Sequence, residues 1–155
     1  MSLRPSKLQN YMDVAEAVSK RSHDAETQVG SVLVNNKTGA IIATGFNGFL
    51  RGTDDTKLPN TRPDKYPYIV HSEQNLIANC ARHGISMEDT MLICTLSPCL
   101  SCMRLLWQCG ITHVVVKEKY KDFDSVCAAQ DINVGTRFTK EGFLELRYRV
   151  ENSSQ

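Results

Sequence analysis

Two cysteines, Cys99 and Cys102, lie three residues apart in the stretch SPCLSC, directly after a proline. Such a pair could form a redox disulfide, half of a structural zinc site or part of a catalytic metal site. A chain of 155 residues can bury a core without disulfide staples, and thiols stay reduced in a protein that is not exported. The close spacing therefore favours a metal or catalytic role over a redox role.

An upstream histidine, His71 in HSEQN, makes this pair a candidate catalytic zinc site. Both stretches open a predicted helix, and a helix N-terminus favours the thiolate form of cysteine. Two thiolates and one imidazole suit zinc, and three protein ligands leave the fourth tetrahedral position for water. A structural zinc ion would use a fourth protein ligand, but the remaining cysteines form no second C-x2-C pair.

Glu73 follows His71 by two residues, so on a helix the two side chains point in different directions. Glu73 is thus a poor fourth ligand, but its carboxylate can carry protons for a water that zinc has activated. H-x-E, then 24 residues, then P-C-x2-C is a far more specific pattern than a lone histidine or cysteine pair. It matches the signature of zinc nucleobase deaminases.

The elements expected to carry these residues alternate between helices and strands. Periodicity and turn residues predict helices over 6–21, 71–83, 98–109 and 124–131, and strands over 27–35, 40–47, 90–96, 112–118 and 143–150. This order predicts a single α/β domain over residues 1–155, with three α/β/α layers and a central mixed five-stranded sheet. A polar loop over 48–67 breaks the pattern, and such long loops are often functional.

The overall composition excludes several classes of protein. The chain is 41% hydrophobic and 23% charged, and its formal net charge of +1 argues against a broad nucleic-acid-binding surface. No apolar run approaches the roughly 18 residues of a membrane span. The N-terminus lacks the apolar segment of a secretory signal. We therefore expect a cytoplasmic protein with no nucleic-acid partner and no membrane association.

The sequence resembles deoxycytidylate (dCMP) deaminases of the cytidine/deoxycytidylate deaminase superfamily well beyond the zinc signature. The similar blocks are RSHDAETQVGSVLV, GFNGFLRG, KYPYIVHSEQNLI, TLSPCLSCMRLLWQCGI and KEKYKDFDS. This resemblance implies the cytidine-deaminase-like fold and the hydrolysis of dCMP to dUMP and ammonia, which feeds dTTP synthesis. The alternatives are deaminases of tRNA adenosine, cytosine or a riboflavin precursor. A non-catalytic zinc-stabilised binding module is disfavoured by Glu73.

The resemblance also implies roles for individual residues. His71, Cys99 and Cys102 would bind one Zn2+ ion, and Glu73 would shuttle protons between water and the cytosine. The substrate-binding positions would be Ser22, Thr27, Asn47, Ser72, Ser97 and Tyr120. Asn47 is expected at the sugar 3′-hydroxyl and Tyr120 near the 5′-phosphate, where local positive charge would come from Lys117, Lys119 and Lys121.

Two stretches depart from the family pattern. Ser72 stands where the usual H-A-E has alanine, and its hydroxyl could crowd the pyrimidine or hydrogen-bond to it. SHDAET replaces the usual S-K-D-P-x-T, so a lysine is missing near Ser22, and His23 is the candidate cation in its place. The other cysteines are expected to pack as small hydrophobic residues: Cys80, Cys94, Cys109 and Cys127.

Many dCMP deaminases are hexamers that dCTP activates and dTTP inhibits. The resemblance therefore implies a homo-oligomer and an effector-binding loop, whose candidate residues are Gly48, Arg51, Gly52 and Asn75. Glycine allows a backbone to approach phosphates closely. Mg2+ is expected only together with a nucleoside triphosphate effector.

Overall fold

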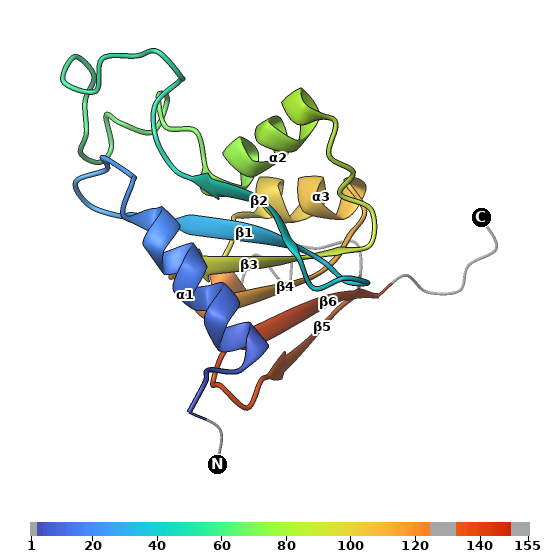
Figure 1. The fold of residues 1–155 in the computed structure, drawn as a ribbon. Coiled ribbons are helices and arrows are strands. Elements are labelled where there is room, and N and C mark those ends of the chain that lie inside the picture. The colour runs from blue at the N-terminus through green and yellow to red at the C-terminus, as the bar shows by residue number, and fades with distance from the viewer. Residues whose placement is uncertain (1–2, 125–132, 150–155) are drawn as a thin grey trace.

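A mixed sheet of six strands forms the middle of the protein, between two layers of helices (Figure 1). The computed structural model describes residues 3–124 and 133–149. The strands are β1 (Gly30–Asn35), β2 (Ile41–Phe46), β3 (Thr90–Leu96), β4 (Ile111–Glu118), β5 (Asn133–Phe138) and β6 (Leu144–Arg149). The helices are α1 (Lys7–Ser19), α2 (Ser72–His83) and α3 (Leu100–Gln108). The strand order is β2-β1-β3-β4-β6-β5, and β3 and β4 pair in parallel.

Among the described residues, α1 covers one face of the sheet, and α2 and α3 cover the other (Figure 1). On the α1 side, Met12 and Ala15 pack against Val32, with all three side chains fully buried. On the other side, Leu76 of α2 and Leu106 of α3 join the main core. Successive strand residues face opposite sides, so a nearly continuous apolar strand such as β1 can supply both cores. The predicted three-layer α/β/α arrangement is confirmed.

The predicted count of five strands is wrong, because β5 forms a sixth. Asn133–Phe138 (NVGTRF) is short, contains a glycine and has few apolar residues, so it carries a weak strand pattern. Its structure comes from a hairpin: β5 pairs with β6 along its whole length, and the turn ends at Gly142, whose φ is +88°. The helix predicted over 124–131 lies, apart from Asp124, outside the described residues.

The helix after β3 begins later than the sequence predicts. We expected Pro98 to open it, but Cys99 is the N-cap and Leu100 is the first helical residue. Cys99 keeps an extended backbone (φ −73°, ψ 170°), while its carbonyl already accepts the first helical hydrogen bond, from the Met103 N–H at 2.9 Å. An N-cap has this geometry, since it is only half inside the helix.

The start of α2 lies directly against β2. A Cβ atom added to Gly45 would lie 2.4 Å from the Ser72 carbonyl oxygen and 2.8 Å from the Leu76 backbone nitrogen. Just before the helix, Val70 exchanges two backbone hydrogen bonds with Gly48, at 2.7 and 3.1 Å. Glycine at position 45 therefore allows the helix to start at this edge of the sheet.

The long loop is tied to the segment before β1 by a buried ion pair. The Lys65 ammonium lies 2.8 and 2.9 Å from the two carboxylate oxygens of Asp24, and both side chains are almost fully buried. Burial alone would raise the pKa of Asp24, but hydrogen bonds from Lys65 and from the Thr27 and Glu26 N–H groups hold it below its ordinary value. No helix in the described part of the chain is long and apolar enough to cross a membrane.

We predict that Gly45→Ala lowers the free energy of unfolding by about 1–3 kcal/mol, since the added methyl group meets backbone atoms that cannot move without shifting α2. Chemical denaturation measures this change. Gly48→Ala is the matched control, because the nearest atoms to its Cβ lie at 3.7 Å. Equal midpoints for the two variants would contradict the close contact between β2 and α2.

We predict that Lys65→Met lowers the free energy of unfolding by about 3–5 kcal/mol at pH 7, because Asp24 then stays buried with no cation beside it. Since the pKa of Asp24 is lowered in the folded state, its contribution is present above the ordinary value of 3.8 and is lost as the pH falls below it. The free energies of unfolding of Lys65→Met and of the wild-type protein should therefore differ less below pH 3.8 than at pH 7. Denaturation curves across pH check this, with the exposed Lys57→Met of the same loop as control. If Lys65→Met unfolds with the same free energy as the wild-type protein at pH 7, the stabilising role of the Lys65–Asp24 pair is refuted.

Candidate active site

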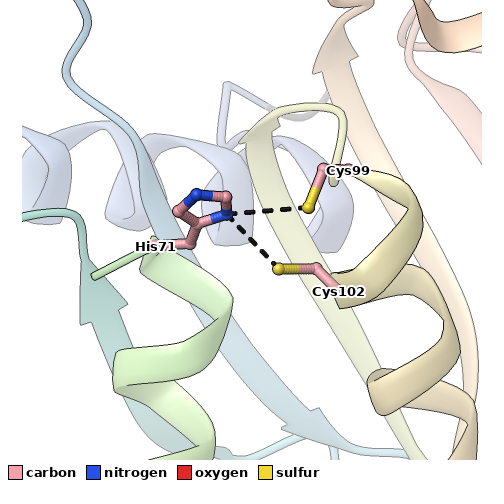
Figure 2. A group of neighbouring side chains, drawn as sticks. All are labelled: His71, Cys99 and Cys102. Atoms are coloured by element: carbon pink, nitrogen blue, oxygen red, sulfur yellow. Dashed lines mark hydrogen bonds between the residues drawn. The ribbon is translucent and has the colours of Figure 1, made fainter. Parts of the chain in front are cut away.

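Three metal-binding side chains meet where α2 and α3 begin (Figure 2). The Nδ1 atom of His71, the N-cap of α2, lies 3.6 Å from the Cys99 sulfur and 3.5 Å from the Cys102 sulfur. All three donor atoms lie within 4.8 Å of one another. Cys99 is the N-cap of α3 and Cys102 lies in its first turn, so both sulfurs face His71.

The spacing of these donors fits a tetrahedral zinc ion. Zn–S bonds of about 2.3 Å and a Zn–N bond of about 2.0 Å, at a tetrahedral angle, place nitrogen and sulfur about 3.5 Å apart. The two nitrogen–sulfur distances of 3.5 and 3.6 Å agree with this value. Among the described residues, these three form the one cluster of histidine, cysteine or acidic side chains with donor atoms close enough together to hold a metal ion. The donor set is therefore one histidine and two cysteines.

The electrostatics of the cluster favour a thiolate at Cys99. Hydrogen bonds with Cys102 and His71 lower the pKa of Cys99 to about 4, although burial opposes this shift. The hydrogen bond with Cys99 in turn raises the pKa of His71. The hydrogen bond to Cys99, together with burial, raises the pKa of Cys102. Cys99 is thus the first of the two cysteines to offer the anionic sulfur that metals bind.

Glu73 lies beside this cluster in a buried position. Its side chain is on the first turn of α2, the residue is 4% exposed, and burial raises the pKa of its carboxyl group. Cys94 of β3 donates a hydrogen bond to Glu73 Oε1 at 3.0 Å. Burial raises the pKa of Cys94 well above its ordinary value, so the thiol keeps the proton that it donates. A carboxyl group with a raised pKa is suited to proton transfer near neutral pH.

The remaining cysteines follow the expectation in part. Cys80 and Cys94 are fully buried in the core, as expected for small hydrophobic residues, although Cys94 also contacts Glu73. Cys109 is half-buried. Cys127 lies outside the described residues.

A cavity of about 390 Å³ opens beside Glu73 and the His71–Cys99 pair. Five of the six predicted substrate positions line it: Thr27, Asn47, Ser72, Ser97 and Tyr120. Ser22 does not belong to its described lining. That side chain is buried and accepts a hydrogen bond from the Asp24 N–H at 3.2 Å. Ser22 therefore supports the segment that carries Asp24 and Thr27.

The polar residues of the cavity wall are fixed by hydrogen bonds. Asn47 accepts from the Val29 N–H and donates to the Thr27 carbonyl, both at 2.9 Å. Elsewhere in the lining, Ser97 Oγ accepts from the Tyr120 N–H at 2.8 Å. These bonds join segments that are far apart in the sequence, so the wall is held in place before any ligand binds.

The Ser72 hydroxyl points toward the sheet. Its Oγ atom lies 2.7 Å from Ser31 Oγ and donates to the Gly45 carbonyl at 3.0 Å. The serine that departs from the family pattern is thus used in packing α2 against β1 and β2.

The positive charge of the cavity wall comes from residues that the sequence did not single out. Lys65 and Arg62, both from the long loop, are its cationic side chains among the described residues. No periodicity marks either residue. Lys65 is the first residue of the block KYPYIVHSEQNLI, and Arg62 lies three residues before it.

The lysines expected near the substrate phosphate lie elsewhere. Lys117 pairs with Glu16 of α1, and Lys119 lies 3.8 Å from Asp124. Lys121 sits over the ring of Tyr120, 5.7 Å from its centre. None of the three belongs to the described lining of the cavity.

A second cavity of about 460 Å³ gathers the four candidate effector residues: Gly48, Arg51, Gly52 and Asn75. His23 also lines this cavity and not the first one, so it does not replace the missing lysine there. Its ring packs on Phe49 with centres 4.2 Å apart, and Nδ1 lies 3.8 Å from Asp55. Asn75 donates to the Phe46 carbonyl at 2.7 Å, and Arg51 donates to Asn79 at 3.3 Å.

Comparisons with known proteins agree with this geometry. The family model of the cytidine and deoxycytidylate deaminase zinc-binding region matches residues 5–118. Deoxycytidylate deaminase from Homo sapiens is 35% identical over 127 residues, which cover 77% of this chain and 70% of that protein. A probable deoxycytidylate deaminase from Drosophila melanogaster is 36% identical over 124 residues, or 72% of this chain and 60% of that protein.

A solved structure shows the same likeness in three dimensions. The dCMP deaminase from the cyanophage S-TIM5, crystallised in complex with dCMP and dUMP, superposes with a TM-score of 0.68 at 31% sequence identity. The match covers 81% of this chain and 90% of the phage protein. This chain therefore belongs to the cytidine and deoxycytidylate deaminase family.

Proposed function

We propose that this protein is a zinc-dependent hydrolase that converts dCMP and water to dUMP and ammonia. The observation that carries this proposal is the buried carboxyl group of Glu73 in the same cavity wall as His71 and Cys99. The names of the relatives and the nucleotides in the cyanophage complex favour dCMP over the bases acted on by other deaminases of this fold.

His71, Cys99 and Cys102 are the proposed ligands of one zinc ion. When bound there, zinc supplies the Lewis acidity that makes a water molecule nucleophilic near neutral pH. Glu73 takes a proton from this water and gives it to N3 of the cytosine, while the water oxygen adds to C4. Glu73 then takes the proton of the new C4 hydroxyl and gives it to the amino group, so that the C4–N bond breaks, ammonia leaves and the oxygen becomes the C4 carbonyl of dUMP. The raised pKa of Glu73 supports both transfers.

The cavity wall supports positions for the rest of the nucleotide. We assign Asn47, Thr27 and Tyr120 to the sugar and phosphate of the nucleotide, because all three line the cavity. The backbone N–H groups of Ser72 and Cys99, where α2 and α3 begin, are proposed to stabilise the negative charge that develops on oxygen. Hydrogen bonds that pre-position these groups reduce the cost of ordering them around the substrate.

The second cavity is proposed to bind the effectors dCTP, which activates, and dTTP, which inhibits, in a hexamer of this chain. Two observations support it. The four candidate residues from two separate segments line one cavity, and Asn75 and Asn79 extend it along α2, the helix that carries Glu73. An Mg2+ ion would accompany only a triphosphate effector.

We expect the zinc-loaded protein to release ammonia from dCMP faster than from CMP, deoxycytidine or cytosine. Glu73→Gln should keep its zinc and lose turnover by about 10²–10⁴-fold, because its amide cannot carry the protons. Ammonia release and ultraviolet absorbance measure turnover, and metal analysis measures zinc. If no cytosine compound is deaminated, the proposed function fails. If Glu73→Gln remains active, the proposed zinc ligands are unaffected but the role of Glu73 in proton transfer is refuted.

We expect dCTP to raise, and dTTP to lower, the initial rate at dCMP concentrations below KM. Arg51→Ala should weaken both responses, since it removes a cation from the second cavity. Arg82→Ala, on the exposed end of α2, is the matched control. If neither nucleotide changes the initial rate of the wild-type protein, the proposed effector site is refuted.

A further inference from the structure

The charge balance of the first cavity singles out one residue. Its described lining contains two cationic side chains, Lys65 and Arg62. Lys65 is already neutralised, because its ammonium contacts both oxygens of Asp24 and lies 3.3 Å from Glu26 Oε1. A buried lysine with two carboxylates as neighbours has no charge to spare for a ligand. The cation that remains is Arg62.

Arg62 is exposed, and within residues 3–124 and 133–149 its guanidinium makes no ion pair. Its Nη2 atom donates to Thr27 Oγ1 at 2.6 Å, and its backbone N–H donates to Glu26 Oε1 at 2.5 Å. The hydrogen bond of the backbone N–H holds this part of the loop against Glu26. The hydrogen bond to the Thr27 hydroxyl directs the Arg62 side chain toward the cavity wall. Because a hydroxyl is neutral, the guanidinium keeps its full charge and its remaining N–H donors.

The position of Arg62 relative to the chemistry follows from the hydrogen bonds of the wall. His71 and Glu73 mark the end of the cavity where the pyrimidine would react. Asn47 lies on the same wall and donates to the Thr27 carbonyl, while Thr27 Oγ1 contacts Arg62. Hydrogen bonds therefore link Asn47, Thr27 and Arg62 along one stretch of the cavity wall. A nucleotide bound with its base at the reacting end must place its sugar and phosphate against the rest of the lining, to which Arg62 belongs.

We propose that Arg62 is the specificity-determining residue that binds the 5′-phosphate and makes the enzyme prefer a nucleoside monophosphate to the nucleoside. This inference rests on the proposed deaminase function. A planar guanidinium forms paired, charge-assisted hydrogen bonds with phosphate oxygens. Two of the three carboxylates in the described lining do not cancel its charge: Asp24 is paired with Lys65, and Glu73 lies at the reacting end. Asp122, also in the lining, has no ion pair among the described residues and stays as opposing charge.

The test compares zinc-loaded wild-type, Arg62→Ala and Arg62→Lys proteins on dCMP and deoxycytidine. Arg62→Ala should lower kcat/KM for dCMP by about 10- to 100-fold, the worth of hydrogen bonds to a charged group, and change that for deoxycytidine less than about twofold. The kcat/KM of Arg62→Lys for dCMP should lie between those of the wild type and Arg62→Ala, because lysine keeps the positive charge but lacks the paired N–H donors of the guanidinium. Lys57→Ala, an exposed lysine of the same loop that lines neither cavity, should match the wild type.

The outcomes separate the inference from the proposed function. A wild-type protein that deaminates no cytosine compound defeats the proposed function. A wild-type protein active on dCMP, with Arg62→Ala impaired equally on both substrates or on neither, defeats only the role of Arg62. If deoxycytidine turns over too slowly to measure, the inhibition constants of dUMP and deoxyuridine give the same comparison. A selective loss of dUMP binding would then support Arg62, and an equal change for both would overturn it.

Discussion

The parallel pairing of β3 with β4 is the constraint from which the site follows. Parallel neighbours need a connection that returns across the sheet, and here that connection is α3. The helix must therefore start where β3 ends, and this puts Cys99 at the C-terminal end of β3. The backbone contact of β2 with α2 brings His71 to the same place. Two helix starts, from different parts of the chain, thus meet at one point.

Around this point, buried polar groups are paired with one another. Glu73 has the Cys94 thiol, and Asp24 has Lys65 and two backbone N–H groups. Leaving any of these carboxylates buried without a partner would cost several kcal/mol, so each pair also fixes the segment that carries it. The loop over 48–67 is a case in point. It lacks a helix or strand of its own, yet Lys65 attaches it to the wall of the cavity.

Much of the fold was predictable because its signals are local. The apolar run Thr90–Leu96 was predicted with the bounds that the structure gives it, and Gly84 ends α2 with a left-handed backbone, as a C-terminal glycine commonly does. The H-x-E and P-C-x2-C stretches likewise carry their chemistry in adjacent residues. By contrast, β5 depends on its pairing with β6, and Lys65 depends on Asp24, which is 41 residues away. The lysines after β4 have suitable charges, but only three-dimensional structure tells where such side chains point.

Helix α2 contributes residues to both cavities. Its first residues, Ser72 and Glu73, line one cavity, and Asn75 and Asn79, less than two turns further on, line the other. Because a helix is stiff over so short a span, the two sites share one rigid wall. On the proposal that the second cavity binds effectors, a molecule that shifts this wall from one side would change the free energy of binding on the other side. Thermodynamic linkage makes that coupling reciprocal: whatever one occupant does to the affinity of the other, the other does to it in equal measure.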